Sequence, residues 1–198
     1  ADIIVVNSCT VTNGADSGVR NYINSMRNSG KKVILTGCGA VSKGDELFKS
    51  SAIFGVLGAS NKSKIDEMLG KSEPFYELGD LNFIDKNIVS NYENHTKAFI
   101  KIQEGCDFAC SYCIIPSVRG FSRSIDEDII LKEAKTLASN GYSEIVLTGT
   151  NIGSYGKGVG TSLGRLVARL GKINGIKRIR LGSIEPSQID ESFREILH

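Results

Sequence analysis

The first seventy residues alternate between short β-branched runs and stretches with apolar residues at helical spacing. Short apolar runs indicate buried strands, whereas apolar residues three or four positions apart indicate one face of a helix. Strands separated by helices predict a parallel sheet with helical crossovers. The expected strands are Ile3–Val6, Val33–Leu35 and Phe54–Leu57, and the expected helices cover residues 15–27, Gly44–Lys49 and residues 65–69.

Residues 71–95 interrupt this alternation of strand and helix patterns. They contain few apolar repeats and many polar residues, as in KSEPFYELGD and DKNIVSNYENH. Such composition indicates an inter-domain linker with room for one short element. We therefore expect one domain over residues 1–70 and a second over residues 96–198.

The second domain repeats the α/β pattern. Ser124 and Asp126 are candidate N-caps for its first helix. The pattern amounts to three consecutive βα units, and in parallel βα folds binding sites lie at the carboxyl ends of the strands. The loops GCDFACSYC, TGTNIGSYG and GSIEPS occupy these ends. The expected strands are Ala98–Gln103, Glu144–Leu147 and Arg178–Leu181, and the expected helices are Ile125–Ser139 and Leu163–Leu170.

The bulk composition is that of an ordinary globular protein. Of the 198 residues, 40% are hydrophobic and 23% charged, and the net charge of +2 argues neither for nor against nucleic acid. No apolar run approaches the ~20 residues of a membrane span, so we expect no membrane association. Five cysteines, with only three prolines and no secretory signal, indicate metal-binding or catalytic thiols in a reducing, cytoplasmic setting. The chain begins without Met inside an expected strand, so we expect it to be a fragment.

Cys106, Cys110 and Cys113 follow the spacing C-x3-C-x2-C. Thiolates are the ligands of iron–sulfur clusters, and a cubane cluster normally takes four of them. Three cysteines would leave one iron of the cluster to bind a ligand that is not a cysteine. An open iron of this kind is what chemistry on a cluster requires. Two alternatives are open: three core cysteines, disfavoured by their crowding into eight residues, and a zinc site that recruits His95.

The stretch AFIKIQEGCDFACSYCIIPSVRGFSRS resembles the cluster motif of radical S-adenosylmethionine (SAM) enzymes. More narrowly, it resembles the methylthiotransferases, in which this motif runs into Pro-x-x-Arg-Gly. The resemblance implies that the three thiolates hold a [4Fe–4S] cluster and that SAM chelates the remaining iron. Reduction would then yield a 5′-deoxyadenosyl radical that abstracts hydrogen from an unactivated carbon. It also implies the fold: a flavodoxin-like parallel-sheet α/β domain followed by the first three βα units of a partial TIM-type radical SAM barrel.

Cys9 and Cys38 each follow an expected strand, so both belong at one edge of a parallel sheet. From spacing alone, two unrelated buried cysteines are slightly favoured. The resemblance implies instead a second, auxiliary [4Fe–4S] cluster held by three cysteines of the N-terminal domain and involved in sulfur delivery. Cys9 and Cys38 match the second and third of these, and the first would lie upstream of Ala1.

The loop TGTNIGSYG is rich in residues that can approach and hydrogen-bond a polar ligand. On sequence alone an ordinary surface loop is favoured. The resemblance implies that Thr148, Gly149 and Asn151 contact the methionine part of SAM. Ser183 and Glu185 are similarly placed, and Glu185 either pairs with the SAM amino group or caps the next helix, since Glu-Pro commonly begins one.

The basic residues do not form a clear RNA-binding pattern in the sequence. Arg119 and Arg123 follow the cysteine loop and are candidates to meet phosphate, as are Lys177, Arg178 and Arg180. For Lys177 and Arg178 a solvated face is favoured. These residues alone do not demonstrate RNA binding.

Within the resembled family, NSCTVT and LTGTNIGSYG are most similar to the branch that methylthiolates N6-threonylcarbamoyladenosine beside the tRNA anticodon. Methylthiolation of N6-isopentenyladenosine in tRNA, or of an aspartate in a small-subunit ribosomal protein, are the alternatives within the family. An iron–sulfur electron carrier or a zinc-stabilised binding module is the alternative of another class. The expected partners are tRNA and an electron donor such as flavodoxin or ferredoxin, and we expect the fragment to be inactive alone.

Overall fold

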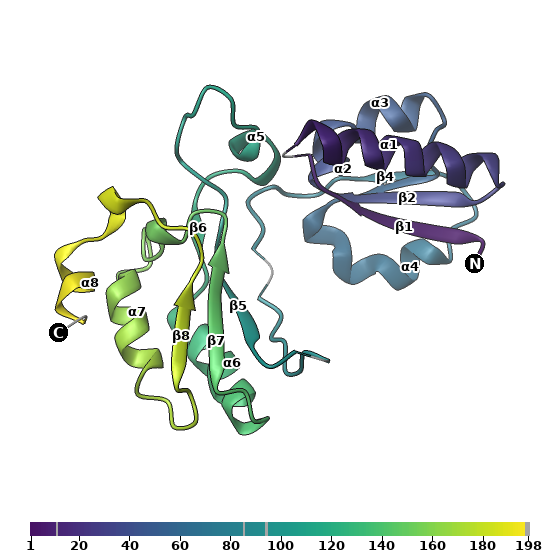
Figure 1. Ribbon diagram of the computed structural model, residues 1–198. Helices are drawn as coiled ribbons and strands as arrows, with labels where there is room; N and C mark the ends of the chain where they lie inside the picture. The colour runs from purple at the N-terminus through teal and green to yellow at the C-terminus, as the bar shows by residue number, and fades with distance from the viewer. Residues whose placement is uncertain (11, 85, 94, 197–198) are drawn as a thin grey trace. The chain divides into compact units, whose positions relative to one another are not determined.

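The computed structural model describes residues 1–10, 12–84, 86–93 and 95–196. The chain forms two compact units, Ala1–Asp85 with Phe108–Gly120, and Lys86–Asp107 with Phe121–His198. Figure 1 shows that each unit is built on its own sheet. The first unit therefore extends beyond residue 70, where the sequence pattern ended, and includes most of the cysteine loop.

The first unit contains a four-stranded parallel sheet in the order β1-β2-β3-β4. This confirms the expected parallel α/β arrangement. The fourth strand lies in the stretch interpreted as a linker. It has only three residues after Pro74, too few to show a period of two. The strands are β1 (Ile3–Ser8), β2 (Lys32–Gly37), β3 (Gly55–Leu57) and β4 (Phe75–Glu77).

Helices cover both faces of this sheet, with α1 and α3 on one face and α4 on the other (Figure 1). Alternation along β2 explains the two layers, because successive side chains of a strand point to opposite faces. Val33 and Leu35 join a core with Ile23 of α1, whereas Ile34 joins a core with Met68 of α4. The elements are α1 (Asn13–Asn28), α2 (Cys38–Ser42), α3 (Gly44–Lys49), η1 (Ala59–Lys64), α4 (Ile65–Leu69) and, from the cysteine loop, α5 (Ile115–Arg119).

The second unit contains a four-stranded sheet in the order β6-β5-β7-β8. Strands β5, β7 and β8 are parallel and are separated by helices, which confirms the three expected βα units. The two-residue strand β6 pairs antiparallel with β5 and was not predicted, since two residues carry no pattern. The elements are β5 (Ala98–Glu104), β6 (Arg123–Ser124), α6 (Glu127–Ser139), β7 (Glu144–Gly149), η2 (Ile152–Ser154), α7 (Leu163–Leu170), β8 (Arg178–Leu181), η3 (Pro186–Gln188) and α8 (Glu191–Glu195).

Helix α6 begins where the sequence offered two caps. Asp126 is the N-cap, and its side chain accepts from the backbone N–H of Asp128. Ser124 instead lies in β6, where its hydroxyl accepts from Gly156 N at 2.9 Å. One face of the helix is fully buried, including Ile130 and Leu137. The cap and this apolar stripe together fix the helix against the sheet.

Residues 89–92, which we call the strap, are bound to the second unit. Val89 N donates to Glu133 of α6 at 3.1 Å, and Tyr92 N donates to the Tyr142 hydroxyl at 2.7 Å. The Tyr142 hydroxyl also lies 2.7 Å from Asn91 Oδ1. The end of the stretch interpreted as a linker is therefore part of the second unit. Across the described residues, no helix has the length and apolar character needed to cross a membrane.

Candidate functional site

Cys9 and Cys38 lie at the same edge of the first sheet. In the parallel register of β1 and β2, Ser8 pairs with Gly37, and each cysteine is the first residue after its strand. Cys38 opens α2 and is buried, whereas Cys9 is exposed. Gly37 has a φ of +81°, and a Cβ there would lie 2.5 Å from Ser8 O. The turn that delivers Cys38 therefore requires glycine.

Arg119 contacts Cys38. Its Nε donates to the Cys38 sulfur at 3.2 Å, and both residues belong to the first compact unit. This guanidinium, expected from sequence to be a candidate for phosphate, lies against a thiol instead. Cys110 is exposed and Cys113 half-buried, and Cys113 N donates to Cys110 O at 3.0 Å in a tight turn. The first unit thus contains four of the five cysteines.

Cys106 is half-buried in the second unit, just after β5. Asn151, from the loop after β7, directs its amide Nδ2 to within 3.8 Å of the Cys106 sulfur. The Thr148 hydroxyl donates to Ile100 O of the neighbouring strand β5 at 3.3 Å. The carboxyl ends of two neighbouring parallel strands therefore bring a cysteine and a predicted SAM residue together.

The base of the cysteine loop is braced on both sides. Asp107 accepts from Ser122 N at 2.9 Å and forms an ion pair with Lys157. The hydrogen bond from Lys157, supported by the one from Ser122 N, holds the pKa of Asp107 below its ordinary value. The ion pair thus connects the loop after β5 to the loop after β7.

The loop after β8 reaches the loop after β7. Gln188 donates to the Ser154 hydroxyl at 3.3 Å and accepts from Glu185 N at 3.4 Å. Glu185 is the N-cap of η3, which is the helix-capping alternative from the sequence, while Ser183 is exposed. Contact of Ser183, Glu185 and the β7 residues with SAM stays a prediction.

Among the described residues, the cysteines are not grouped as ligands around one metal centre. All five carry thiols, and within the described ranges no group of three or more Cys, His, Asp or Glu side chains is arranged to hold a metal ion. His95, the candidate zinc ligand, packs its ring edge-on against Phe99. The fit to an iron–sulfur cluster therefore rests on donor chemistry: three thiols within eight residues, one exposed and two half-buried.

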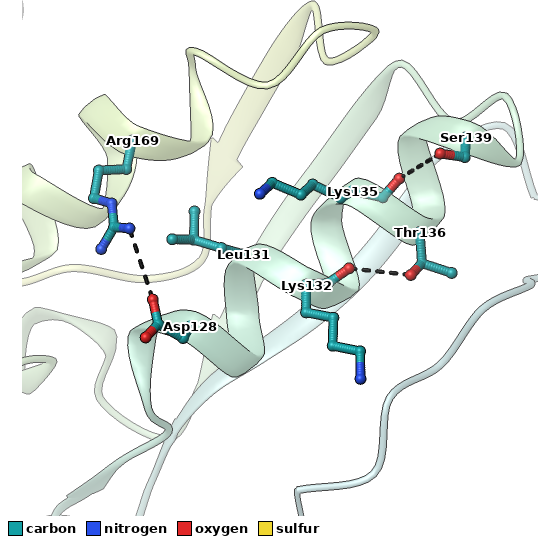
Figure 2. Close-up of a pocket in the computed structure, with 7 residues that line it drawn as sticks. All are labelled: Asp128, Leu131, Lys132, Lys135, Thr136, Ser139 and Arg169. Atoms are coloured by element: carbon teal, nitrogen blue, oxygen red, sulfur yellow. Dashed lines mark hydrogen bonds and ion pairs between the residues drawn. The ribbon is translucent and has the colours of Figure 1, made fainter.

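A groove of about 410 Å³ lies along α6 beside α7. Figure 2 shows Arg169 directed toward Asp128, which it pairs with at 3.7 Å, while Lys132 and Lys135 extend from the helix. The groove is therefore mainly basic. Its walls include no cysteine and no residue predicted to bind SAM, so it is separate from the candidate site. The lining residues are Asp128, Leu131, Lys132, Lys135, Thr136, Ser139 and Arg169.

Two residues important to the site were not predicted to belong to it. The fully buried Gln103 connects the loops that carry Cys106 and Asn151. Its only sequence signal was a polar side chain at the end of an alternating strand that leads into the cysteine loop. Arg119 was noticed for its charge, but its partner is 81 positions away in the sequence.

Two family models match the chain. Residues 1–58 match the uncharacterized protein family UPF0004, and residues 100–196 match the radical SAM superfamily. The two matched ranges cover most of the two expected α/β regions and leave out the polar stretch between them.

The chain is also similar to curated proteins over its whole length. It is 52% identical to a putative methylthiotransferase of Helicobacter pylori, over 100% of this chain and 48% of that protein. It is 36% identical to the threonylcarbamoyladenosine tRNA methylthiotransferase MtaB of Aquifex aeolicus, over 100% of this chain and 50% of that protein. It is 35% identical to a tRNA-2-methylthio-N(6)-dimethylallyladenosine synthase of Campylobacter hominis, over 99% of this chain and 48% of that protein. The chain spans about half the length of these relatives.

Proposed function

The chain belongs to the radical SAM methylthiotransferase family, and on that premise we propose that the gene product containing it methylthiolates N6-threonylcarbamoyladenosine in tRNA. The reaction replaces a C–H bond of the modified adenosine with C–SCH3. Because the chain spans about half of its relatives, this activity is proposed for the whole gene product.

The observation that carries the proposal is that Cys9 and Cys38 directly follow two neighbouring parallel strands of the first sheet, whereas Cys106 follows β5 of the second sheet and begins the C-x3-C-x2-C motif. The radical SAM superfamily implies a [4Fe–4S] cluster and SAM, which when bound supply the radical chemistry. Cys106, Cys110 and Cys113 would hold that cluster. We propose that Cys9 and Cys38 hold a second, auxiliary cluster together with a further cysteine, because each directly follows one residue of the last register pair, Ser8 and Gly37.

The protein's own side chains would position these groups. Arg119 donates to the sulfur of Cys38, and Asn151 directs an N–H toward that of Cys106. N–H···S hydrogen bonds stabilise the negative charge on a thiolate ligand. SAM would be held by the loops that follow β7 and β8, through Thr148, Gly149, Asn151, Ser183 and Glu185.

The choice of nucleoside rests on the motifs NSCTVT and LTGTNIGSYG. Relatives named for threonylcarbamoyladenosine and for dimethylallyladenosine are about equally similar, at 36% and 35% identity. Methylthiolation of N6-isopentenyladenosine is therefore the second candidate, and modification of a ribosomal-protein aspartate the third. The partners would be tRNA and an electron donor such as flavodoxin or ferredoxin, in the cytoplasm where tRNA is modified.

Mass spectrometry of tRNA nucleosides from cells that lack the gene tests the substrate. Loss of the methylthio group from N6-threonylcarbamoyladenosine alone is the expected result, and re-expression should restore it. Loss from the isopentenyl derivative would favour the second candidate. Unchanged tRNA nucleosides, with a mass change in the small-subunit ribosomal protein, would contradict the tRNA assignment.

A second experiment separates the enzyme from a plain iron–sulfur or zinc protein. The whole gene product is reconstituted anaerobically with iron and sulfide, reduced, and titrated with SAM under EPR. SAM should change the spectrum of the cluster, because it occupies the iron that three cysteines leave open. A spectrum that SAM leaves unchanged would contradict the proposed function.

A further inference from the structure

Gln103 is a fully buried polar side chain at the end of β5. Its amide Nε2 donates to Gly105 O at 2.7 Å and to the Ser122 hydroxyl at 3.0 Å. Its Oε1 accepts from Asn151 N at 2.7 Å. A buried amide with both ends bonded is held in one orientation, because any rotation would leave polar groups unpaired.

These bonds connect two loops that the chain places 45 residues apart. Gly105 immediately precedes Cys106, and Asn151 belongs to the loop after β7. Asn151 in turn directs its side chain toward the Cys106 sulfur, at 3.8 Å. The side chain of Gln103 therefore sets the position of the cysteine and of the amide that faces it.

The backbone around Gln103 is shaped to admit it. In the pairing of β5 with β7, Lys101 is opposite Thr148 but Gln103 is opposite Gly149, so the register shifts at Ile102. This irregularity makes Ile102 and Gln103 both buried, where a regular strand would alternate. A Cβ on Gly149 would lie 2.9 Å from Gln103 O and 3.0 Å from its Oε1. The close approach of Gln103 is therefore sufficient to explain why position 149 is glycine.

We propose that Gln103 is a positioning residue that fixes the Cys106 loop against the Asn151 loop, so that the cluster ligand and the SAM-facing loop are already aligned when cofactor binds. The role in SAM binding rests on the proposed function, whereas the alignment of the two loops does not. Preorganisation of this kind raises affinity, because less conformational freedom is lost on binding.

Two substitutions test the role in the whole gene product. Gln103→Leu removes both the donor and the acceptor with little change in volume. Gln103→Glu retains an acceptor for Asn151 N–H but, when ionised, cannot donate to Gly105 O. The matched control is Ile145→Val, a fully buried change in the neighbouring strand β7 that lowers stability without touching either loop.

The first readout is hydrogen exchange in the protein without its clusters. We expect the Asn151 amide to lose protection in Gln103→Leu and to keep it in Ile145→Val. Should Gln103→Leu fail to fold, Gly149→Ala supplies a second test, because its new methyl group would lie 2.9 Å from Gln103 O and 3.0 Å from Gln103 Oε1 and so crowd the group that bonds Asn151 N. Equal exchange of Asn151 in the wild type and in the folded variant would overturn the inference, whatever the protein's activity.

The second readout is SAM affinity after reconstitution, with iron content measured alongside. We expect affinity to fall about tenfold in Gln103→Leu, the equivalent of one displaced hydrogen-bonded contact, and to stay unchanged in Ile145→Val. The SAM affinity of Gln103→Glu should lie between those of Gln103→Leu and Ile145→Val. Unchanged SAM affinity in Gln103→Leu at equal iron content would overturn the role in binding. Failure of the wild type to bind SAM would contradict the proposed function and leave the exchange result as the test of alignment.

Discussion

Arg119 Nε donates to the sulfur of Cys38 at 3.2 Å, which joins the end of the cysteine loop to the first sheet within one compact unit. A cationic N–H donor compensates the charge of a thiolate ligand and makes its cluster easier to reduce. We expect Arg119→Gln to lower the reduction potential of the proposed auxiliary cluster in the whole gene product, and Arg119→Lys to lower it less. Potentiometric EPR measures the shift.

The control for Arg119 is Arg27→Gln, the same change in the last turn of α1. It removes one positive charge from the same unit without removing a donor to Cys38. Equal potentials for Arg119→Gln and Arg27→Gln would show that the hydrogen bond has no role. A drop in the potential of the other cluster alone would place Arg119 at that cluster.

The two cysteine sets should be separable by mutation. Cys110→Ala removes a proposed ligand of the radical SAM cluster, so we expect formation of 5′-deoxyadenosine to be abolished while the proposed auxiliary cluster keeps its iron. Cys38→Ser should do the reverse: lose iron from the auxiliary cluster yet still cleave SAM. Iron analysis and chromatography of 5′-deoxyadenosine check both. Continued SAM cleavage by Cys110→Ala would contradict the ligand assignment.

The strap depends on the Tyr142 hydroxyl, which accepts from Tyr92 N and contacts Asn91 Oδ1. Tyr142→Phe leaves these groups without that partner, so we expect the strap to open more easily by about 1–2 kcal/mol. Hydrogen exchange of the Tyr92 amide measures this opening. Tyr155→Phe is the matched control, because the buried Tyr155 hydroxyl has no hydrogen-bond partner among the described residues. An equal effect of the two variants would rule out a specific role for Tyr142.

Glu133 makes the stability of the second unit depend on pH. Burial raises the pKa of Glu133 above its ordinary value of 4.5, and the N–H of Val89 opposes this only in part. The folded state therefore holds its proton more tightly than the unfolded state. Stability is greatest below pH 4.5 as far as this group is concerned, and falls as pH rises through the raised pKa.

Glu133→Gln removes that titration and keeps an oxygen to accept from Val89 N. We expect the variant to gain thermal stability relative to the wild type at pH 7.5, and to gain less or nothing at pH 4.5. Thermal unfolding of the protein without its clusters at the two pH values gives this difference. A constant offset between the two proteins at both pH values would contradict the prediction.

Sequence periodicity was sufficient for the long elements and insufficient for contacts between distant residues. Helices α1 and α6 lie within two residues of their predicted bounds and α7 matches its bounds, because each carries a clear apolar stripe. Strand β6 and the strap depend on hydrogen bonds to partners far along the chain, which a local pattern does not contain. The hydrogen bonds between Gln103 and Asn151 and between Arg119 and Cys38 also join residues far apart in the sequence. They could therefore be identified only in the folded structure.

The register of β1 and β2 makes the distance between Cys9 and Cys38 independent of the chain between them. Since Ser8 and Gly37 are paired, the sheet brings the next two residues together however long the crossover helix is. Whole turns could be inserted in or deleted from α1 at its far end without separating the cysteines, whereas a one-residue slip between the strands would separate them. A search for related sites should therefore look for cysteines that terminate adjacent parallel strands and allow any number of residues in between.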